Sequence, residues 1–180
     1  MPSCGRGVSP PAVFIGTHAL LPVCGALVME NVSLARGRGH VFPAWSMPVI
    51  GLFGALPDIC TPHLSLEARY TSWSHTAWFL IGVAVVCPMV ASFYPAQRWR
   101  VALACWFASV LHLACDAISG GIAYLFPWRP ELIVGAFYVY PDYWFPLDAF
   151  FILLTWFLIR LRPHAEARGM RRNRKADTES

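Results

Sequence analysis

The chain has 180 residues, of which 57% are hydrophobic and only 13% are charged, and its mean hydropathy is +0.49. Because soluble domains carry about 25% charged residues, this composition argues against a soluble globular protein and indicates an integral membrane protein whose length suits one domain. The net charge of +4 is uneven, since seven of the fourteen basic residues lie between Arg160 and Lys175, and such a basic run favours anchoring at the cytoplasmic membrane surface over nucleic-acid binding.

Apolar stretches follow one another along the chain, at residues 12–29, 45–57, 75–94, 99–118 and 144–161. All but the second approach the ~20 residues that cross the hydrocarbon core of a bilayer. The second is shorter and is interrupted by prolines and glycines, so we expect it to be tilted or to enter the bilayer only in part. The pattern predicts an all-α, polytopic membrane helical bundle of about four to five membrane-embedded helices. Residues 1–162 form this predicted domain, and residues 163–180 form a basic cytoplasmic tail that we expect to be disordered.

The first stretch has a second interpretation, as a cleaved signal peptide. Arg6 precedes it, and the segment LPVCG resembles a lipoprotein cleavage box. However, Pro22 and Val23 fit that box poorly, and His18 is unusual in a signal-peptide core. A membrane helix is therefore the favoured interpretation.

The basic residues predict the orientation of the bundle. If the C-terminal tail is cytoplasmic and five crossings alternate, eleven Lys and Arg residues lie on the inner side. Only Arg6, Arg69 and Arg129 then lie on the outer side. Since cytoplasmic loops carry an excess of Lys and Arg, we predict a multi-pass protein of the inner (plasma) membrane with a cytoplasmic C-terminus.

This orientation brings unusual polar residues to one depth. His18, Asp58, His75, His112 and Asp116 all fall near the outer ends of their predicted segments, although only Lys and Arg were used to place those segments. His112 and Asp116 are four residues apart and therefore share one face of a helix. The segment containing His63 lies close by in sequence, and the role of that histidine is left open.

Imidazole and carboxylate groups together suit a divalent metal, zinc above all, with manganese and iron less specific. Taken singly, these residues have structural explanations: His18 could be a packing residue, Asp58 a helix cap, and His112 with Asp116 a hydrogen-bonded pair. Their convergence favours metal ligands, because charged groups inside a membrane are costly and are usually paired or functional.

The sequence also resembles a known family in four short blocks. These are GTHALLPVCGAL, GALPDIC, SWSHTAWF and LHLACDAISGGIAYLFPW, in this order between about residues 16 and 128. They are similar to blocks of the membrane-bound metal-dependent hydrolase family, also labelled LexA-binding, inner-membrane-associated hydrolases, which read approximately T-H, P-D-x-D, H-R-G-x-T-H-S and H-x-x-x-D. A weaker similarity surrounds Asp148. The resemblance implies metal ligands at the same positions: His18, Asp58, His75, His112 and Asp116.

Two positions depart from the family pattern. Cys60 stands where the second Asp of P-D-x-D would be, and Tyr70 with Thr71 stands where the family has His-Arg. A thiolate can bind zinc, whereas tyrosine is a poor replacement for a histidine ligand. These departures are consistent with an altered substrate or with a loss of activity.

The resulting prediction is a metal-dependent hydrolase that acts at the outer face on a phosphoester or a lipid-linked substrate. Asp58 and Asp116 are the candidate catalytic residues, as metal ligand or general base, and Arg69 is the candidate for holding an anionic group of the substrate. The phosphoester class follows from a distant similarity of the family to zinc-dependent phospholipases C. The alternatives are a non-catalytic membrane protein with a structural His/Asp cluster, and a small metal transporter. Binding of a LexA-type repressor is suggested by the family label alone.

Overall fold

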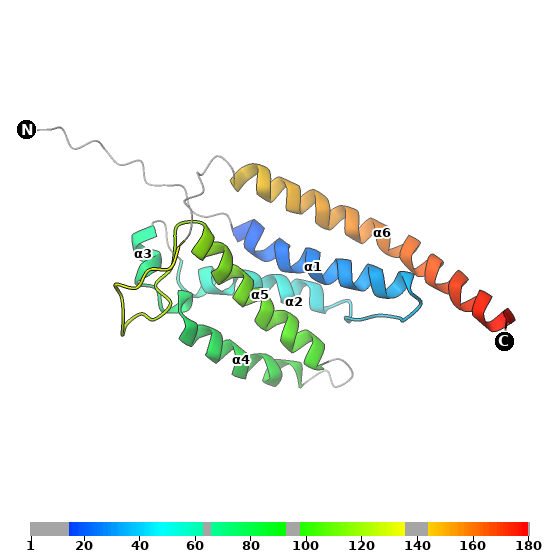
Figure 1. Cartoon of the computed structure of the whole chain (residues 1–180), viewed down its shortest axis with the longest axis horizontal. Coiled ribbons are helices and arrows are strands. Elements are labelled where there is room, and N and C mark those ends of the chain that lie inside the picture. Colours follow the sequence, from blue (N-terminus) through cyan, green and yellow to red (C-terminus); the bar gives the residue numbers. More distant parts are fainter. Residues whose placement is uncertain (1–14, 63–65, 93–97, 136–143, 180) are drawn as a thin grey trace, which may run out of the picture.

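The computed structural model describes residues 15–62, 66–92, 98–135 and 144–179 (Figure 1). Within these residues the architecture is all-helical, and the extended pairing is confined to a single bridge between Ile122 and Val134. The elements in chain order are α1 (Ile15–Ala35), α2 (Ser46–Cys60), α3 (Leu66–Tyr70), the 3-10 turn η1 (Trp73–His75), α4 (Ala77–Ala91), α5 (Arg98–Ile118) and α6 (Trp144–Glu179).

The all-helical prediction is confirmed, and each of the five apolar stretches corresponds to a helix: α1, α2, α4, α5 or α6. Two described helices, over Gly16–Ala35 and Trp99–Ile118, are long and apolar enough to cross a membrane. Two further apolar helices, Ser46–Cys60 and Ala77–Met89, are shorter. The short elements α3 and η1 lie in the connection between α2 and α4.

The centre of the bundle is formed by α1, α2 and α5, with α4 packed on α5 and α6 packed along α1 (Figure 1). The buried core includes Leu27, Ile50 and Phe53. Helices α1 and α2 approach closely at Gly54, where a Cβ atom would lie 2.4 Å from the backbone oxygen of His18. This close approach requires glycine, and it positions the N-terminal end of α1 beside the C-terminal end of α2.

Large apolar side chains cover the outside of the bundle. Among the most exposed are Val85 and Met89 of α4, Phe107 of α5, and Leu153 and Trp156 of α6. Soluble monomers seldom expose continuous apolar surface on several helices. This outer face is therefore that of a protein surrounded by lipid.

The C-terminal tail differs from its prediction. We expected disorder from residue 163, but α6 continues to Glu179 and lies against the end of α1. A Cβ atom at Gly169 would lie 2.0 Å from the backbone oxygen of Leu34, and the Asn173 side-chain amide donates to the carbonyl oxygen of Gly37 at 3.2 Å. Composition alone did not reveal this contact, because it depends on one glycine and one asparagine meeting a turn more than 130 residues away.

Candidate metal centre

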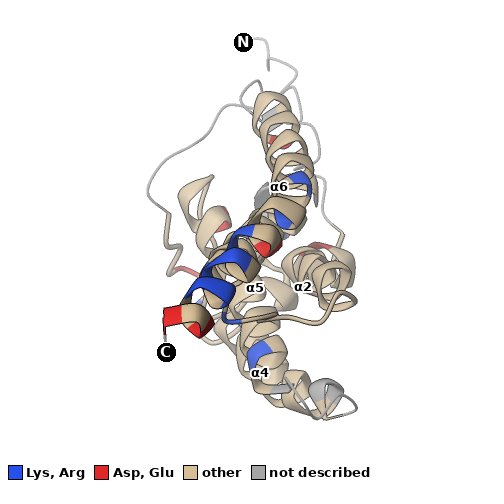
Figure 2. Ribbon diagram, turned by 90° about the vertical axis from the view of Figure 1, so that its right-hand side faces the viewer, with Lys and Arg blue, Asp and Glu red and all other residues tan. Residues whose placement is uncertain are grey.

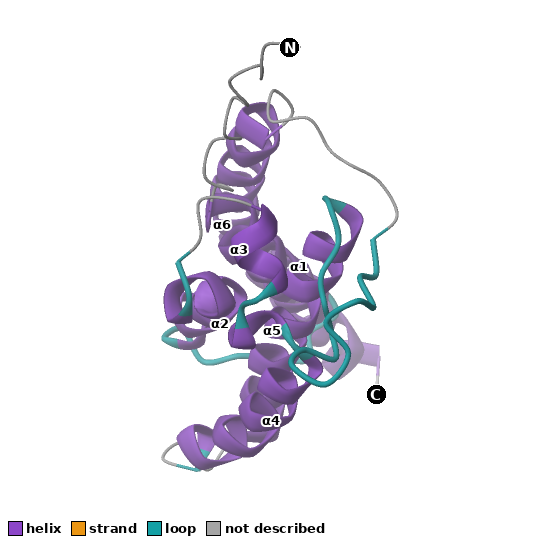
Figure 3. Cartoon of the chain, turned by 90° about the vertical axis from the view of Figure 1, so that its left-hand side faces the viewer, coloured by secondary structure: helices purple, strands orange, loops and turns teal. Residues whose placement is uncertain are grey.

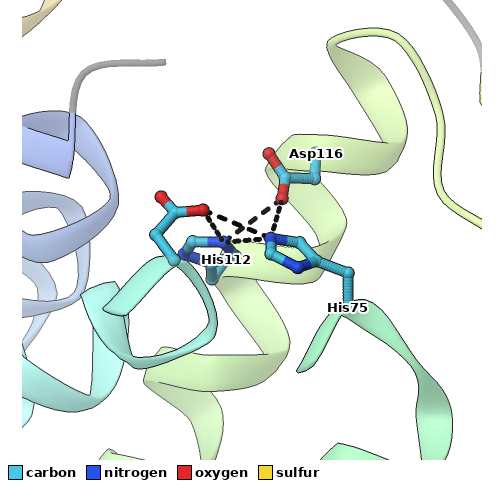
Figure 4. A group of neighbouring side chains, drawn as sticks. His75, His112 and Asp116 are labelled. Atoms are coloured by element: carbon cyan, nitrogen blue, oxygen red, sulfur yellow. Dashed lines mark hydrogen bonds and ion pairs between the residues drawn. The ribbon is translucent and has the colours of Figure 1, made fainter. Parts of the chain in front are cut away.

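Four buried side chains from three segments meet at one end of the bundle. Asp58 comes from the last turn of α2, His75 from η1, and His112 and Asp116 from successive turns of α5. One potential ligand atom from each residue lies within 4.8 Å of the others. Figure 4 shows His75, His112 and Asp116 pointing toward one another, and Figure 3 shows α3 and the connecting loops gathered at this end of the molecule.

Local sequence explains how His75 reaches this group. The Thr76 hydroxyl accepts from the backbone N–H of Phe79 and caps the N-terminus of α4. Threonine is a favoured capping residue because its side chain satisfies a free N–H of the first turn. His75 therefore sits just outside α4, at the end of the 3-10 turn η1, with its side chain directed toward α2 and α5.

Five of the six distances between the ligand atoms of this group are close to the edges of a tetrahedron, and all of the atoms lie within 4.8 Å of one another. His75 Nε2 lies 3.2 Å from Asp58 Oδ1 and 3.2 Å from Asp116 Oδ2. His112 Nε2 lies 3.5 Å from Asp58 Oδ1 and 3.2 Å from Asp116 Oδ2, and the two Nε2 atoms are 3.4 Å apart. Zinc bound to nitrogen and oxygen at about 2.0–2.2 Å holds neighbouring ligand atoms about 3.3–3.6 Å apart. The donor set and its spacing thus fit a zinc-sized divalent cation.

Hydrogen bonds fix which nitrogen of each imidazole faces the group. His112 Nδ1 lies 2.7 Å from the carbonyl oxygen of Gly54, which can only accept, so Nδ1 carries the hydrogen. His75 Nδ1 lies 3.0 Å from Ser72 Oγ and 3.1 Å from Ser74 Oγ, and the hydroxyl of Ser74 donates to the carbonyl oxygen of Pro57 at 2.7 Å. Histidine ligands commonly donate their second ring N–H in this way, which orients the ring toward the metal.

The charges of the group require compensation. Two carboxylates and two Nε2 atoms face one another, and each of the four residues that carry them is at most 7% exposed. Buried carboxylates are costly unless they are paired or coordinate a metal. Arg69 supplies one positive charge, 3.3 Å from Asp116 Oδ1. Further positive charge can come from protons on the Nε2 atoms or from a divalent cation between the four atoms.

His18 and Arg69 lie beside the group. Both contact Oδ1 of Asp116, whereas Oδ2 of the same carboxylate faces the two imidazoles of the group. His18 Nε2 is 3.5 Å from Asp116 Oδ1, and its ring lies 4.1 Å from that of His112 between centroids. Arg69 is 1% exposed and reaches Asp116 Oδ1 at 3.3 Å and the Asp116 carbonyl oxygen at 3.4 Å. The structure therefore brings all five predicted ligands together, but the four-atom group does not include His18.

The two departures from the family pattern lie outside the four-atom group. Cys60 is exposed. The Tyr70 hydroxyl donates to the carbonyl oxygen of Gly120 at 2.7 Å, where it holds the turn that follows α5. Neither residue supplies an atom to the group in this arrangement, and His63 lies outside the described residues.

Two contacts, one partly buried and one buried, were missed by sequence reasoning. The Asp148 carboxylate of α6 accepts a hydrogen bond from Thr17, next to His18, so the weak similarity around Asp148 was a usable signal. Glu30 is 0% exposed in the opposite half of α1 and accepts from the backbone N–H groups of Val41 and Phe42 at 2.8 and 3.0 Å. Nothing in the sequence around Glu30 distinguished it from a solvated residue near the end of a helix.

Comparison with known proteins identifies the family. The family described as YdjM inner membrane protein matches residues 14–176, so the chain belongs to this family. This description gives a membrane location and names no activity. No curated protein and no solved structure matches the chain significantly.

Proposed function

Starting from its place in the YdjM inner membrane protein family, we propose that the protein is a multi-pass membrane enzyme that binds a zinc ion and hydrolyses an ester. The observation that carries this proposal is the group formed by Asp58, His75, His112 and Asp116, with ligand spacings of 3.2–3.5 Å. Each imidazole in it is already oriented through its other nitrogen. A divalent metal in such a site polarises water and the oxygen of an ester.

The four residues differ in access to solvent, and this difference suggests a division of roles. The side chain of Asp58 is 8% exposed, whereas those of His75, His112 and Asp116 are 0–1% exposed. Catalytic zinc sites usually have three protein ligands and one open position. We assign His75, His112 and Asp116 as the ligands and Asp58 as the general base at the open position, which takes a proton from the attacking water.

Arg69 and His18 hold Asp116 in this scheme. Both contact its Oδ1 atom, which leaves Oδ2 directed at the two imidazoles. The burial of Arg69 makes contact with Asp116 its main role, while its assignment to an anionic group of the substrate stays a prediction. Partners of this kind keep a ligand oriented and commonly affect metal affinity about 10–100-fold.

The substrate class that we propose is a phosphoester attached to a lipid, at the outer face of the membrane. The site lies at one end of the bundle, and apolar side chains cover the helices that lead away from it. A water-activating site at headgroup depth is reached most directly by a molecule that is itself held in the membrane. The resemblance of the four sequence blocks to metal-dependent hydrolases supports the same class.

The strongest competing proposal is a structural metal site without catalysis. Four protein ligands around one zinc ion are typical of structural sites, and the four-atom group permits that arrangement. A transporter is supported less well, because the side chains between this site and the other end of the bundle include the packed apolar residues Val23, Leu27 and Phe53.

Asp58→Asn distinguishes the two proposals. If Asp58 is the base, the variant should keep about one equivalent of zinc and lose most hydrolysis of a phosphatidylglycerol headgroup in vesicles, because general-base catalysis contributes about 10²–10⁴-fold. If Asp58 is a fourth ligand of a structural site, the variant should lose zinc and the parent should show no hydrolysis. His112→Ala is the control that removes the metal under both proposals. Zinc content is measured on the protein in detergent, and headgroup release on the protein in vesicles.

A further inference from the structure

A pocket of basic residues lies at the opposite end of the bundle from the metal centre. It has a volume of about 620 Å³ and is lined by Val32, Ala35, Arg36, Arg168, Arg171, Arg172 and Lys175. The end of α1 forms one wall and the C-terminal part of α6 forms the other. Figure 2 shows the basic residues of α6 gathered toward its C-terminal end.

The positive charge of this pocket is not balanced within the described part of the chain. No carboxylate lines it, and among the described residues Lys175 alone of the five cations has an acidic partner, Glu179 at 3.6 Å. Like charges four residues apart on a helix, such as those of Arg168 and Arg172, destabilise one another. An anion in the pocket would remove that repulsion.

The pocket has a defined shape because α6 is held against α1. Gly169, between Arg168 and Arg171 in sequence, lies against the backbone of Leu34, and Asn173 donates to Gly37. The arginines are therefore presented by a packed helix. A flexible basic tail would attract anions by net charge alone, whereas this arrangement places four guanidinium groups around one volume.

Exposed apolar surface begins directly beside the pocket. Val32 lines it and is 42% exposed, and Met29, one turn earlier on the same helix, is 56% exposed. This arrangement matches that of a phospholipid. The basic groups lie where the phosphate would be, outside the hydrocarbon, and the apolar surface lies where the acyl chains would be. Free phosphate would make no use of the apolar side.

We propose that this pocket binds the headgroup phosphate of an anionic phospholipid, with the acyl chains lying along Met29 and Val32. Guanidinium groups suit this role because they form bidentate hydrogen bonds to phosphate. Anionic lipids concentrate in the cytoplasmic leaflet and attract basic groups close to the membrane. The bound lipid would join the ends of α1 and α6 and fix the depth of the bundle in the membrane.

The test uses the purified full chain in neutral detergent, with phosphatidylglycerol or phosphatidylethanolamine added. Bound lipid is counted by native mass spectrometry, and the thermal midpoint is followed in parallel. Inorganic phosphate and glycerol 1-phosphate form a separate arm that supplies the anion without acyl chains. The pocket variant combines Arg168→Gln with Arg172→Gln. The matched control, Arg38→Gln with Arg174→Gln, removes the same charge from exposed positions at the same end that do not line the pocket.

The parent should retain phosphatidylglycerol at least about tenfold better than phosphatidylethanolamine, and the pocket variant should lose about tenfold of that affinity, while the control keeps it within about twofold. Gly169→Val, which keeps every charge but separates the helices, should lose the preference as well. Equal weakening in the control and the pocket variant would overturn the proposal in favour of net charge alone. Stabilisation by inorganic phosphate equal to that by the lipid would overturn it in favour of a free-anion site. Because the proposed function has the parent hydrolysing phosphatidylglycerol, every lipid measurement is repeated in the His112→Ala background, which should neither hold zinc nor hydrolyse the lipid. The same lipid preference, and the same loss in the pocket variant, in that background separates this proposal from the hydrolase proposal.

Discussion

The imidazole Nδ1 of His112 donates its hydrogen to the backbone carbonyl oxygen of Gly54, 2.7 Å away. This bond joins α5 to α2 and directs His112 Nε2 toward His75 and the two carboxylates. Gly54 also lies where α1 and α2 approach closely, because a side chain there would meet the backbone of His18. One glycine therefore serves both the helix packing and the orientation of a proposed metal ligand.

Gly54→Ala should destabilise the bundle and weaken the metal centre together. The new Cβ atom would lie 2.4 Å from the His18 backbone oxygen, so α1 and α2 must separate. Overpacking of this kind costs about 1–3 kcal/mol. The control is Gly25→Ala in α1, where a Cβ atom meets nothing within 4 Å, and where alanine should be neutral or stabilising by up to about 1 kcal/mol. Thermal unfolding in detergent compares the two variants. Equal midpoints would contradict the packing argument.

Ser74→Ala should lower zinc affinity without removing any ligand. The variant deletes the hydroxyl that links His75 Nδ1 to the carbonyl oxygen of Pro57 and that also contacts Ser72 Oγ, the second partner of Nδ1. The ring therefore keeps one partner and loses part of its orientation. Loss of such a partner commonly costs about 10–100-fold in metal affinity. Competition with a zinc chelator measures the change. Ser92→Ala is the matched control and should bind zinc like the parent, because its exposed hydroxyl donates to the carbonyl oxygen of Met89 within the last turn of α4.

Glu30→Ala should destabilise the end of the bundle opposite the His/Asp group and leave the zinc content unchanged. The carboxylate is fully buried and holds the backbone N–H groups of Val41 and Phe42, together with His40 at 2.7 Å and Arg162 at 3.6 Å. Removing one partner of a buried charged network costs about 3–5 kcal/mol. Glu166→Ala, which removes an exposed i,i+4 pair with Arg162, should cost less than about 1 kcal/mol. A parental melting temperature for Glu30→Ala, or a loss of zinc, would refute this assignment.

The orientation of the protein can be tested apart from its chemistry. Eleven of the fourteen basic residues lie on one side if the chain crosses the membrane five times. A reporter fused after Ser180 should therefore behave as cytoplasmic, and a reporter in the segment that contains Arg129 should behave as external. If the C-terminal fusion were active on the external side, the predicted orientation would be wrong, and the His/Asp group would lie at the inner face.

The approximate positions of the five long helices were predictable, because the length of an apolar stretch can be read directly from the local sequence. The convergence of Asp58, His75, His112 and Asp116 was predictable for a related reason: in a bundle that alternates direction, the ends of successive helices meet on one side of the membrane. The same argument placed His18 and Arg69 near the group, but sequence could not assign them to the far oxygen of Asp116. That distinction depends on side-chain directions that only packing determines.

The errors have a common physical origin in contacts between distant segments. Net charge and polarity predicted a disordered tail, whereas a close approach at Gly169 holds it against α1. Glu30 was overlooked because its partners come from a loop more than ten residues away and from α6. The two residues named as departures from the family pattern, Cys60 and Tyr70, also lie outside the group, since Cys60 is exposed and Tyr70 bonds the turn after α5. Spacing in a motif does not determine which way a side chain points once the helix has ended.

The central claim is that a divalent metal occupies the group of Asp58, His75, His112 and Asp116, and metal stoichiometry tests it most directly. The parent protein, purified in detergent without chelator, is compared by elemental analysis with His112→Asn combined with Asp116→Asn. These substitutions keep similar shapes and hydrogen-bonding capacity but remove one imidazole and one carboxylate from the group. We predict about one equivalent of zinc per parent chain, and a variant that holds at least about tenfold less. If the variant holds as much zinc as the parent, or if the parent holds none after incubation with zinc, the metal centre is contradicted and the group is a hydrogen-bonded packing element.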